Sequence, residues 1–251
     1  MPTPVPPPWP GRAPGLVTPA GVPGGVMAVL DLADAPAAPD DAALAALEAT
    51  GWLHPEEVAR ASAFPLPRRG SWVGGRLALR HARRTLEPAA RDAAVLATDR
   101  GGPLLPPHLA GSISHKGTRA MALLVRASPA IHAVGMDVEE RPAADAPPGP
   151  DLAPRILTAA EQERLAVQAP SPRARRDATL VAFALKEAVY KAIDPVVRRY
   201  VRFTEVEVAL GPPGPVAVRL LLPDPPLRGA AVSAAWTVEG PWITAVATLR
   251  R

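Results

Sequence analysis

The sequence predicts a mixed α/β (α+β) protein, because helical and strand-like patterns both occur along its 251 residues. Residues 180–196 place apolar side chains three and four positions apart, which is the spacing of one helix face. In residues 131–139 the two-residue period of a strand puts Asp137 and Glu139 on one face. Residues 201–249 are divided into short β-rich runs by Gly-Pro turns.

The elements expected in the first half begin after a Pro- and Gly-rich stretch, residues 1–24, which should be a flexible or extended lead-in. They are a strand at 26–32, a helix capped by Asp40 or Asp41 and stopped by Gly51, a helix starting near His54, a helix within 68–86 entered near Gly74 and Gly75, a Gly-flanked polar segment at 111–117, and a strand at 120–125.

The second half opens with the strand at 131–139. Thr158 and Glu161 are spaced as a capping box that starts a helix running to about residue 168. Ser171 caps the long helix, which should end or kink near Pro195. Strands are then expected at 201–210, 216–222, 230–238 and 242–249.

Composition restricts the classes of function. Hydrophobic residues make up 48% of the chain, enough for one large domain or two small ones, and Cys is absent, which excludes disulfides, Cys-ligated zinc and a catalytic thiol. We expect a cytoplasmic protein without a signal peptide or a membrane-spanning segment. A net charge of +4 suits an anionic partner, whereas 4% aromatic residues do not support a nucleic-acid stacking platform.

Lysine is rare in this chain. Only Lys116, Lys186 and Lys191 stand among 28 basic residues, so nearly every positive charge is an arginine. Because an ammonium is a compact point charge that suits phosphate, the lysines at 186 and 191 indicate specific sites. The alternative is a solvated i,i+4 pair between Glu187 and Lys191, worth about 0.3 kcal/mol.

Carboxylates offer a second candidate site. Asp137 and Glu139 on one strand face, joined by Glu187 from the long helix, would form an all-oxygen site suited to Mg²⁺. The alternative is that the two strand carboxylates are merely the solvated side of that strand.

Two further groups carry possible chemistry. Arg76 and Arg80 lie one turn apart and would clamp a phosphate, unless they belong to a solvated basic stripe. Ser114 and His115 are adjacent, so on a strand they point to opposite faces and do not make a nucleophile–base pair. His115 and Lys116, between glycines, are expected to be exposed beside a backbone that a ligand can approach closely.

These stretches together resemble the 4'-phosphopantetheinyl transferases, in particular the branch that activates siderophore and other nonribosomal peptide synthetases. The resemblance covers roughly residues 50 to 210 and rests on four blocks in the family's order. They are Arg68, Arg69, Gly75, Arg76 and Arg80; Gly-Ser-Ile-Ser-His at 111–115; Gly-Met-Asp-Val-Glu at 135–139; and Phe-x2-Lys-Glu-Ala-x-Tyr-Lys-Ala at 183–192.

The resemblance implies two similar halves, residues 25–130 and 131–251, packed as a pseudo-dimer with the active site between them. It implies a monomeric, Mg²⁺-dependent enzyme that moves 4'-phosphopantetheine from coenzyme A to a serine of an acyl or peptidyl carrier protein and releases 3',5'-ADP. Phosphoryl transfer needs a metal and cations around a charged transition state, which agrees with the residue types present.

The same resemblance assigns roles to single residues. Asp137, Glu139 and Glu187 would hold Mg²⁺, and Glu187 would also take the proton of the incoming serine, directly or through water. Lys186 and Lys191 would neutralise phosphate charge.

In the first half, the resemblance places His115 on the pyrophosphate, with Ser114 in the same binding set. Arg76 and Arg80 would bind the nucleotide end of coenzyme A, including its 3'-phosphate. Two rival functions stay open: a coenzyme A or nucleotide binding module that performs no transfer, and a structural or interaction protein whose charges are solvated faces.

Overall fold

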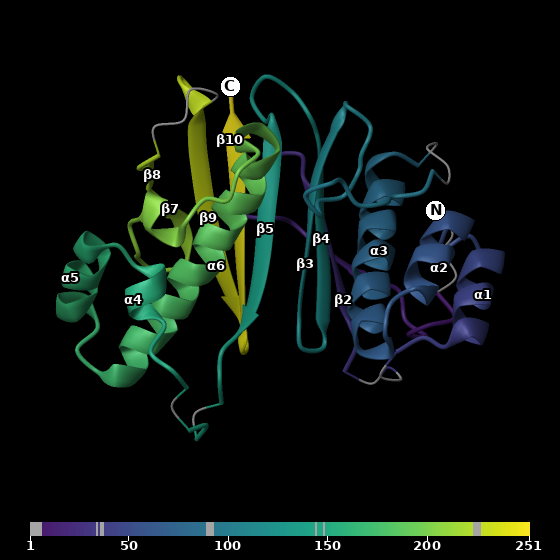
Figure 1. Cartoon of the computed structure of the whole chain (residues 1–251), viewed down its shortest axis with the longest axis horizontal. Helices are drawn as coiled ribbons and strands as arrows, with labels where there is room; N and C mark the ends of the chain where they lie inside the picture. The colour runs from purple at the N-terminus through teal and green to yellow at the C-terminus, as the bar shows by residue number, and fades with distance from the viewer. Residues whose placement is uncertain are drawn as a thin grey trace. The chain divides into compact units, whose positions relative to one another are not determined.

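The computed structural model describes residues 7–33, 35, 38–88, 93–143, 145–147, 149–222 and 227–251. The chain divides into two compact units: unit 1 is Met1–Pro19 and Gly24–Arg126, and unit 2 is Ala20–Pro23 and Ala127–Arg251. Both units combine a sheet with helices (Figure 1), so the predicted α/β class is confirmed.

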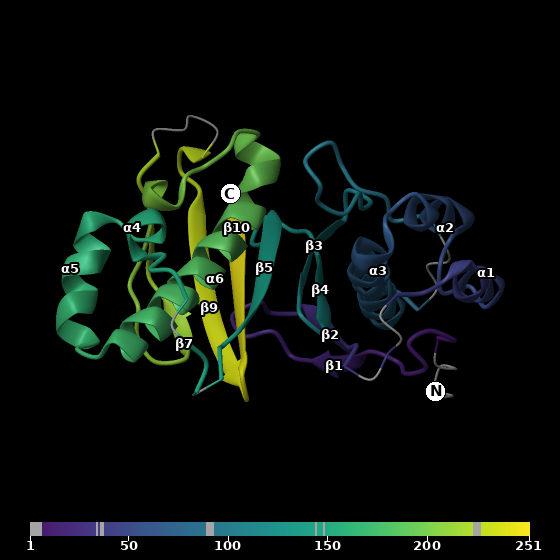
Figure 2. The same cartoon turned by 60° about the horizontal axis from the view of Figure 1, so that its bottom comes forward.

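Unit 1 is an antiparallel sheet with one long helix on its face. Its elements are β1 (Gly15–Val17), β2 (Val26–Asp31), α1 (Asp41–Ala49), α2 (Pro55–Ser62), α3 (Leu66–Leu86), β3 (Leu109–Lys116) and β4 (Arg119–Arg126). The strand order is β1-β2-β4-β3, and α3 packs against β2, β3 and β4. Figure 2 shows α1 and α2 beyond α3, on the side away from the sheet.

The short helices of unit 1 begin where their caps predict. The Asp40 side chain accepts a hydrogen bond from the Ala43 N–H at 2.8 Å and so caps α1. In α2, the His54 side chain caps the helix, and Glu57 reaches back to accept the His54 N–H at 2.8 Å. Each cap satisfies backbone donors that the first turn of a helix leaves open.

The predicted entry of the third helix at Gly74 and Gly75 is wrong, because α3 begins at Leu66 and both glycines lie inside it. Their role is close packing. A Cβ on Gly75 would lie 2.7 Å from Ile113 Cγ2, and one on Gly74 would lie 3.0 Å from Ala120 Cβ. The glycines thus let α3 lie against β3 and β4.

Two other segments of unit 1 are more regular than expected. Part of the Pro-rich lead-in, β1, pairs with β2 at the sheet edge, and residues 1–6 of that lead-in lie outside the described part of the chain. The Gly-flanked segment at 111–117 is largely β3, which pairs along its length with β4. Gly117, at φ +51°, supplies the left-handed turn between these strands.

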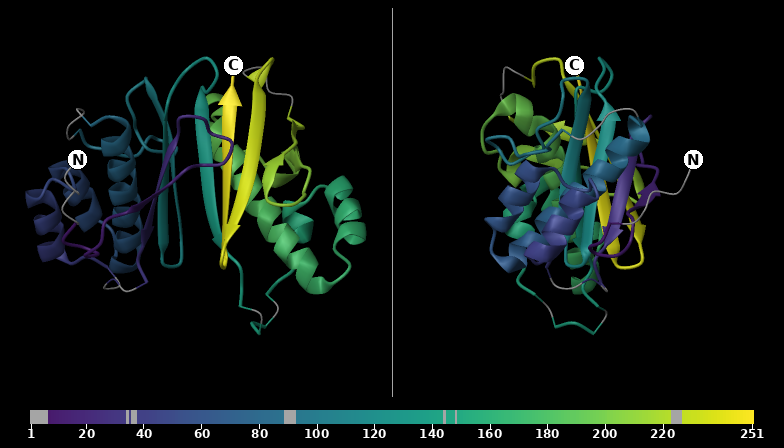
Figure 3. Two further views of the ribbon diagram at one scale, coloured as in Figure 1. Left: turned by 180° about the vertical axis from the view of Figure 1, so that it is seen from behind. Right: turned by 90° about the vertical axis from the view of Figure 1, so that its right-hand side faces the viewer.

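Unit 2 has a second antiparallel sheet covered by its own long helix. Its elements are β5 (Ala133–Glu140), α4 (Ala153–Ile156), α5 (Ala159–Gln168), α6 (Pro172–Val197), the 3₁₀ turn η1 (Phe203–Glu205), β6 (Val206–Val208), β7 (Gly214–Val216), β8 (Val218–Leu220), β9 (Ala231–Glu239) and β10 (Trp242–Arg250). The main sheet has the order β5-β10-β9-β7, and β6 pairs with β8. Figure 3, seen from behind, shows β10 between β5 and β9.

Helix boundaries in unit 2 mostly agree with the sequence. The capping box of Thr158 and Glu161 opens α5, and Ser171 caps α6 by accepting the Ala174 N–H at 3.1 Å. The expected end near Pro195 is slightly early, since α6 continues to Val197. A proline there removes one helical hydrogen bond within the last turn, where little helix remains to be broken.

The strands predicted between 201 and 222 are shorter than expected. Residues 203–205 form η1, and only Val206–Val208 of the first predicted strand is a strand. Of the second, predicted at 216–222, the structure has β8 (Val218–Leu220) and the last residue of β7, Val216, as strand. The two C-terminal strands stand close to their predicted bounds.

The two units share one topology although no repeat is legible in their residues. In each, a first strand (β2 or β5) is followed by a long helix (α3 or α6) and then by a hairpin (β3–β4 or β9–β10). The second hairpin strand, β4 or β10, lies between the first strand and the other hairpin strand and pairs with both. Across the described residues, no helix is both long enough and apolar enough to span a membrane.

Candidate functional site

Asp137 and Glu139 lie on β5, and both are buried. They retain 5% and 7% of their exposure, and Glu140 is the one exposed position of that strand. The interpretation of the pair as a solvated strand face is therefore wrong. Buried carboxylates are costly unless a cation or hydrogen-bond donors lie nearby, so the residues around this strand must supply them.

Gly135 brings α6 directly against this part of β5. A Cβ at Gly135 would lie 1.9 Å from the Ala188 carbonyl oxygen and 2.6 Å from the Ala192 nitrogen. A side chain larger than hydrogen would push the helix away. The close approach sets Glu187 and Lys191, which precede Ala188 and Ala192, next to the carboxylates of β5.

Lys191 reaches from α6 to β5. Its ammonium donates to Asp137 Oδ1 at 2.7 Å and to the Met136 carbonyl at 3.0 Å, and 27% of the side chain is exposed. A pair confined to the helix surface, the alternative for Lys191, does not describe this geometry, because the ammonium spans two elements. It neutralises a buried carboxylate while keeping a path to solvent.

Glu187 faces the same group of charges. Burial raises the pKa of the Glu187 carboxyl above its ordinary value; Lys191 opposes that rise, while the carboxylates of Asp137 and Glu139 add to it. A raised pKa makes a carboxylate a better proton acceptor, which suits a general base.

The three carboxylates fit Mg²⁺ in kind. They offer hard oxygen donors, and the repulsion that Asp137 and Glu139 exert on Glu187 is of the sort that a divalent cation relieves. Within the described ranges, however, no three His, Cys, Asp or Glu side chains stand close enough to ligate one ion. Ligation by all three would therefore require these side chains to rotate toward one another.

Lys186, the second lysine of α6, points into the interior of unit 2. Its ammonium donates to Glu161 Oε2 at 2.6 Å, to the Ile156 carbonyl at 2.8 Å and to the Phe203 carbonyl at 3.1 Å. These contacts use all three of its donors. Its predicted contact with phosphate stays a prediction, and would require at least one of these hydrogen bonds to open.

Arg76 of α3 is a buried cation of unit 1 whose Nε has no hydrogen-bond partner among the described residues. It is 6% exposed, and neither a hydrogen bond nor an ion pair holds its guanidinium within the described part of the chain. Burial lowers the pKa of Arg76 to about 10, with the carboxylate of Glu57 opposing, so the group stays charged at neutral pH. A buried cation without acceptors is costly, and an anionic ligand would supply them.

Arg80, one turn further along α3, is held differently. It forms a buried salt bridge with Glu57, the capping-box residue of α2, whose other oxygen accepts the Val95 N–H at 3.0 Å. Arg69 of the same sequence block pairs with Asp41 at 2.9 Å. Neither is a solvated stripe residue. The predicted phosphate contact of Arg80 stays a prediction that competes with Glu57.

Ser114 and His115 lie at the end of β3. Ser114 is buried and His115 and Lys116 are exposed, so the two predicted ligand contacts of this strand point to opposite faces. The exposure predicted for His115 and Lys116 is confirmed. Which phosphate, if any, they contact stays a prediction.

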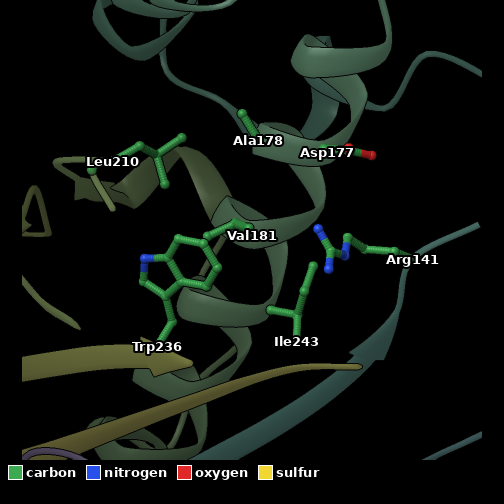
Figure 4. A pocket seen from close by; sticks show the side chains of 8 residues that line it. Arg141, Asp177, Ala178, Val181, Leu210, Trp236 and Ile243 are labelled. Atoms are coloured by element: carbon green, nitrogen blue, oxygen red, sulfur yellow. The ribbon is translucent and has the colours of Figure 1, made fainter. Parts of the chain in front are cut away.

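A pocket of about 220 Å³ lies in unit 2, on the sheet face that carries Asp137 and Glu139 (Figure 4). Val181, Leu210, Trp236 and Ile243 line it, with Arg141 and Asp177 among its polar residues. Ile243 is the cross-strand partner of Glu139, and Arg141 follows Glu139 by two residues. The pocket therefore extends the face that carries Asp137 and Glu139.

Sequence reasoning missed the tertiary contacts of four residues: Gly135, Glu57, Glu161 and Trp72, whose ring lies under the Arg76 guanidinium. The two glutamates had a signal, since each stands at the third position of a short helix, where a capping box places a carboxylate. That pattern predicts their backbone contacts and says nothing of the cation each one holds. Gly135 and Trp72 act through packing that is not visible in local sequence.

Two family models match successive parts of the chain. Residues 54–125 match the 4'-phosphopantetheinyl transferase N-terminal domain, and residues 133–247 match the 4'-phosphopantetheinyl transferase superfamily. Between them only residues 126–132 are left unmatched. The first model thus matches unit 1 from His54 onward and the second matches most of unit 2, in the order that the four sequence blocks predicted.

Solved structures give a weaker likeness, and no curated protein sequence gives a match. The Chronobacterium ammoniagenes ACPS–CoA complex is 22% identical over 47% of this chain and 95% of that chain, with a TM-score of 0.35. An apo-ACPS structure from the same organism is 20% identical over 47% of this chain and 96% of that chain, with a TM-score of 0.33. The family models, rather than these structures, carry the assignment: the chain belongs to the 4'-phosphopantetheinyl transferase superfamily.

Proposed function

We propose that this protein transfers 4'-phosphopantetheine from coenzyme A to a serine of an acyl or peptidyl carrier protein, and that the reaction depends on Mg²⁺. The observation that carries the proposal is the group of buried carboxylates on β5, faced by Glu187 and Lys191 of α6. Such a group matches the blocks by which the chain resembles the transferases, and its chemistry suits a polyanionic donor.

In the proposed reaction, the serine oxygen forms a bond to the phosphorus that bears the pantetheine. The bond from that phosphorus to the bridging oxygen breaks, and 3',5'-ADP leaves with the electron pair. The serine proton passes to Glu187, directly or through water. Lys191 would exchange its contact with Asp137 for one with phosphate oxygen, a geometry that a compact ammonium permits.

Asp137, Glu139 and Glu187 would hold the Mg²⁺ ion, which when bound supplies positive charge against the pyrophosphate. On the nucleotide side, Arg76 is the best-supported contact for a phosphate, because it is buried, charged and lacks hydrogen-bond acceptors in the described residues. Ser114 and His115 are the proposed contacts of unit 1 with the pyrophosphate of coenzyme A. Activation of siderophore or other nonribosomal peptide synthetases, in the cytoplasm and by a monomer, is the finer form of this proposal.

The test is mass spectrometry of an isolated peptidyl carrier domain after incubation with the protein, coenzyme A and Mg²⁺. A mass gain of one phosphopantetheine on the carrier serine is expected, with none when EDTA replaces Mg²⁺ or when the serine is changed to Ala. If coenzyme A binds by calorimetry and no carrier domain, acyl or peptidyl, is modified, the non-catalytic binding module is the better description.

A further inference from the structure

We propose that Trp72 is the positioning residue that holds Arg76 for the 3'-phosphate of the donor nucleotide. The Arg76 guanidinium lies over the Trp72 ring, with its central carbon 4.5 Å from the ring centroid. This inference rests on the proposed function, because it takes Arg76 to be a phosphate contact. It goes further by naming the side chain that fixes how Arg76 presents its donors.

The stacking is suited to that task. Trp72 and Arg76 stand four residues apart on α3, so their side chains meet on one helix face. A ring beneath a guanidinium fixes the plane of the cation and leaves its N–H edges open to acceptors. Those edges are what a phosphate engages in a bidentate contact. Trp72 thus restrains Arg76 without consuming the donors that a ligand needs.

The ring is itself held in place. Phe64 packs against Trp72 with ring centroids 5.7 Å apart and planes inclined by 52°. Phe64 in turn lies beneath Arg68 and Arg60, whose guanidinium carbons are 4.7 Å and 4.9 Å from its centroid. The aromatic support under Arg76 therefore continues from α3 to the end of α2.

Other arginines that stack on rings do not depend on them in the same way. Arg84 lies 4.5 Å from the Trp52 centroid, but it also donates a hydrogen bond to the Gly51 carbonyl. Arg60 and Arg68 are exposed and can be hydrated. Among these stacked arginines, Arg76 alone is buried and held by an aromatic face without a hydrogen bond in the described residues.

The experiment compares two ligands that differ only in the 3'-phosphate, 3',5'-ADP and 5'-AMP, by calorimetry. Trp72→Leu removes the ring and Trp72→Phe keeps a smaller one, while Phe64→Leu removes an aromatic contact that does not touch Arg76. We expect Trp72→Leu to weaken 3',5'-ADP binding about threefold to tenfold, the range of one cation–π contact. Binding of 5'-AMP should change less than about twofold, and Trp72→Phe should recover most of the loss.

A double variant separates positioning from a general structural effect. If Trp72 acts through Arg76, Trp72→Leu combined with Arg76→Ala should bind 3',5'-ADP no worse than Arg76→Ala alone, because contacting residues do not add. Additive losses, or equal losses for both ligands, would overturn the role of Trp72. If Arg76→Ala discriminates between the two ligands as wild type does, Arg76 is not the 3'-phosphate contact, and both statements fall. Thermal unfolding of each variant confirms that it is folded.

Discussion

Among the cations of the long helices α3 and α6, two in each helix are held in contrasting ways. One is fixed by a buried glutamate from the first turn of a short helix: Glu57 holds Arg80, and Glu161 holds Lys186. The other, Arg76 or Lys191, lies where a ligand can add to or replace its contacts. Each helix therefore has one cation in a buried salt bridge that stabilises the fold and one cation placed to contact a ligand.

The salt bridges of Arg80 and Lys186 are alike in one further respect. Glu57 also accepts the Val95 N–H, and Glu161 also accepts the Val208 N–H at 2.7 Å, so each glutamate joins a short helix, a long helix and a distant backbone segment. Close packing is also shared but differently placed. In unit 1 the glycine that permits it, Gly75, lies on the helix, and in unit 2 it is Gly135 on the strand.

We expect the largest loss of activity when the carboxylate that binds Lys191 of α6 is removed. Asp137→Ala should lower kcat for phosphopantetheine transfer by at least about a thousandfold, because it removes both a proposed Mg²⁺ ligand and the partner of Lys191. Glu140→Ala, at the exposed end of the same strand, is the matched control and should be close to wild type. Near-normal turnover of Asp137→Ala at limiting Mg²⁺ would show that the metal site is misplaced.

Loss of a fixed cation should be seen first in stability. Lys186→Met would leave the Glu161 carboxylate buried without its cation, which costs about 3–5 kcal/mol of unfolding free energy in comparable cases. Urea unfolding followed by circular dichroism measures this. Adding Glu161→Gln to Lys186→Met should recover part of the loss, since a neutral amide is cheaper to bury. A Lys186→Met protein of normal stability would contradict the structural role of this lysine.

Sequence alone could predict the elements whose signals are local. The caps at Asp40, Thr158 and Ser171 stand within three residues of the backbone groups that they satisfy, so spacing reveals them. The long helix and the strand bearing Asp137 were visible for the same reason. The start of α3 was not, because its glycines indicate packing against β3 and β4 rather than a helix terminus, and that packing partner lies far along the chain.

The candidate site was predicted as a set of residues and not as a set of contacts. Lys186 precedes Glu187 by one residue and Lys191 follows it by four. Nothing in their local sequence says that Lys186 is buried against Glu161 and that Lys191 is joined to Asp137. The deciding partners stand 25 and 54 residues away. The carboxylates of Asp137 and Glu139 on β5 are buried rather than solvated, and their burial likewise depends on elements that are distant in the sequence.

The ligand-directed cation of α3 should affect donor binding more than chemistry. Arg76→Ala is expected to raise the KM for coenzyme A by about tenfold to a hundredfold, the worth of one or two charged hydrogen bonds, with a smaller change in kcat. Dephospho-coenzyme A, which lacks the 3'-phosphate, is the control donor, and its KM should hardly change. A variant that still distinguishes the two donors as wild type does would separate Arg76 from the 3'-phosphate.

The smallest expected effect concerns the shape of the ligand-directed cation of α6. Lys191→Arg keeps the positive charge, so a residue needed only to pair with a carboxylate would tolerate it. Lys191 instead reaches both Asp137 and the Met136 carbonyl in a partly enclosed space, where a planar guanidinium cannot take the place of an ammonium. We expect kcat to fall at least about tenfold, a loss of about 1.4 kcal/mol of transition-state stabilisation. Coenzyme A affinity, measured by calorimetry, should change much less. An unaffected kcat would mean that only the positive charge at position 191 matters and not the shape of the ammonium. Lys186 and Lys191 would then differ only in how much each contributes to the stability of the fold.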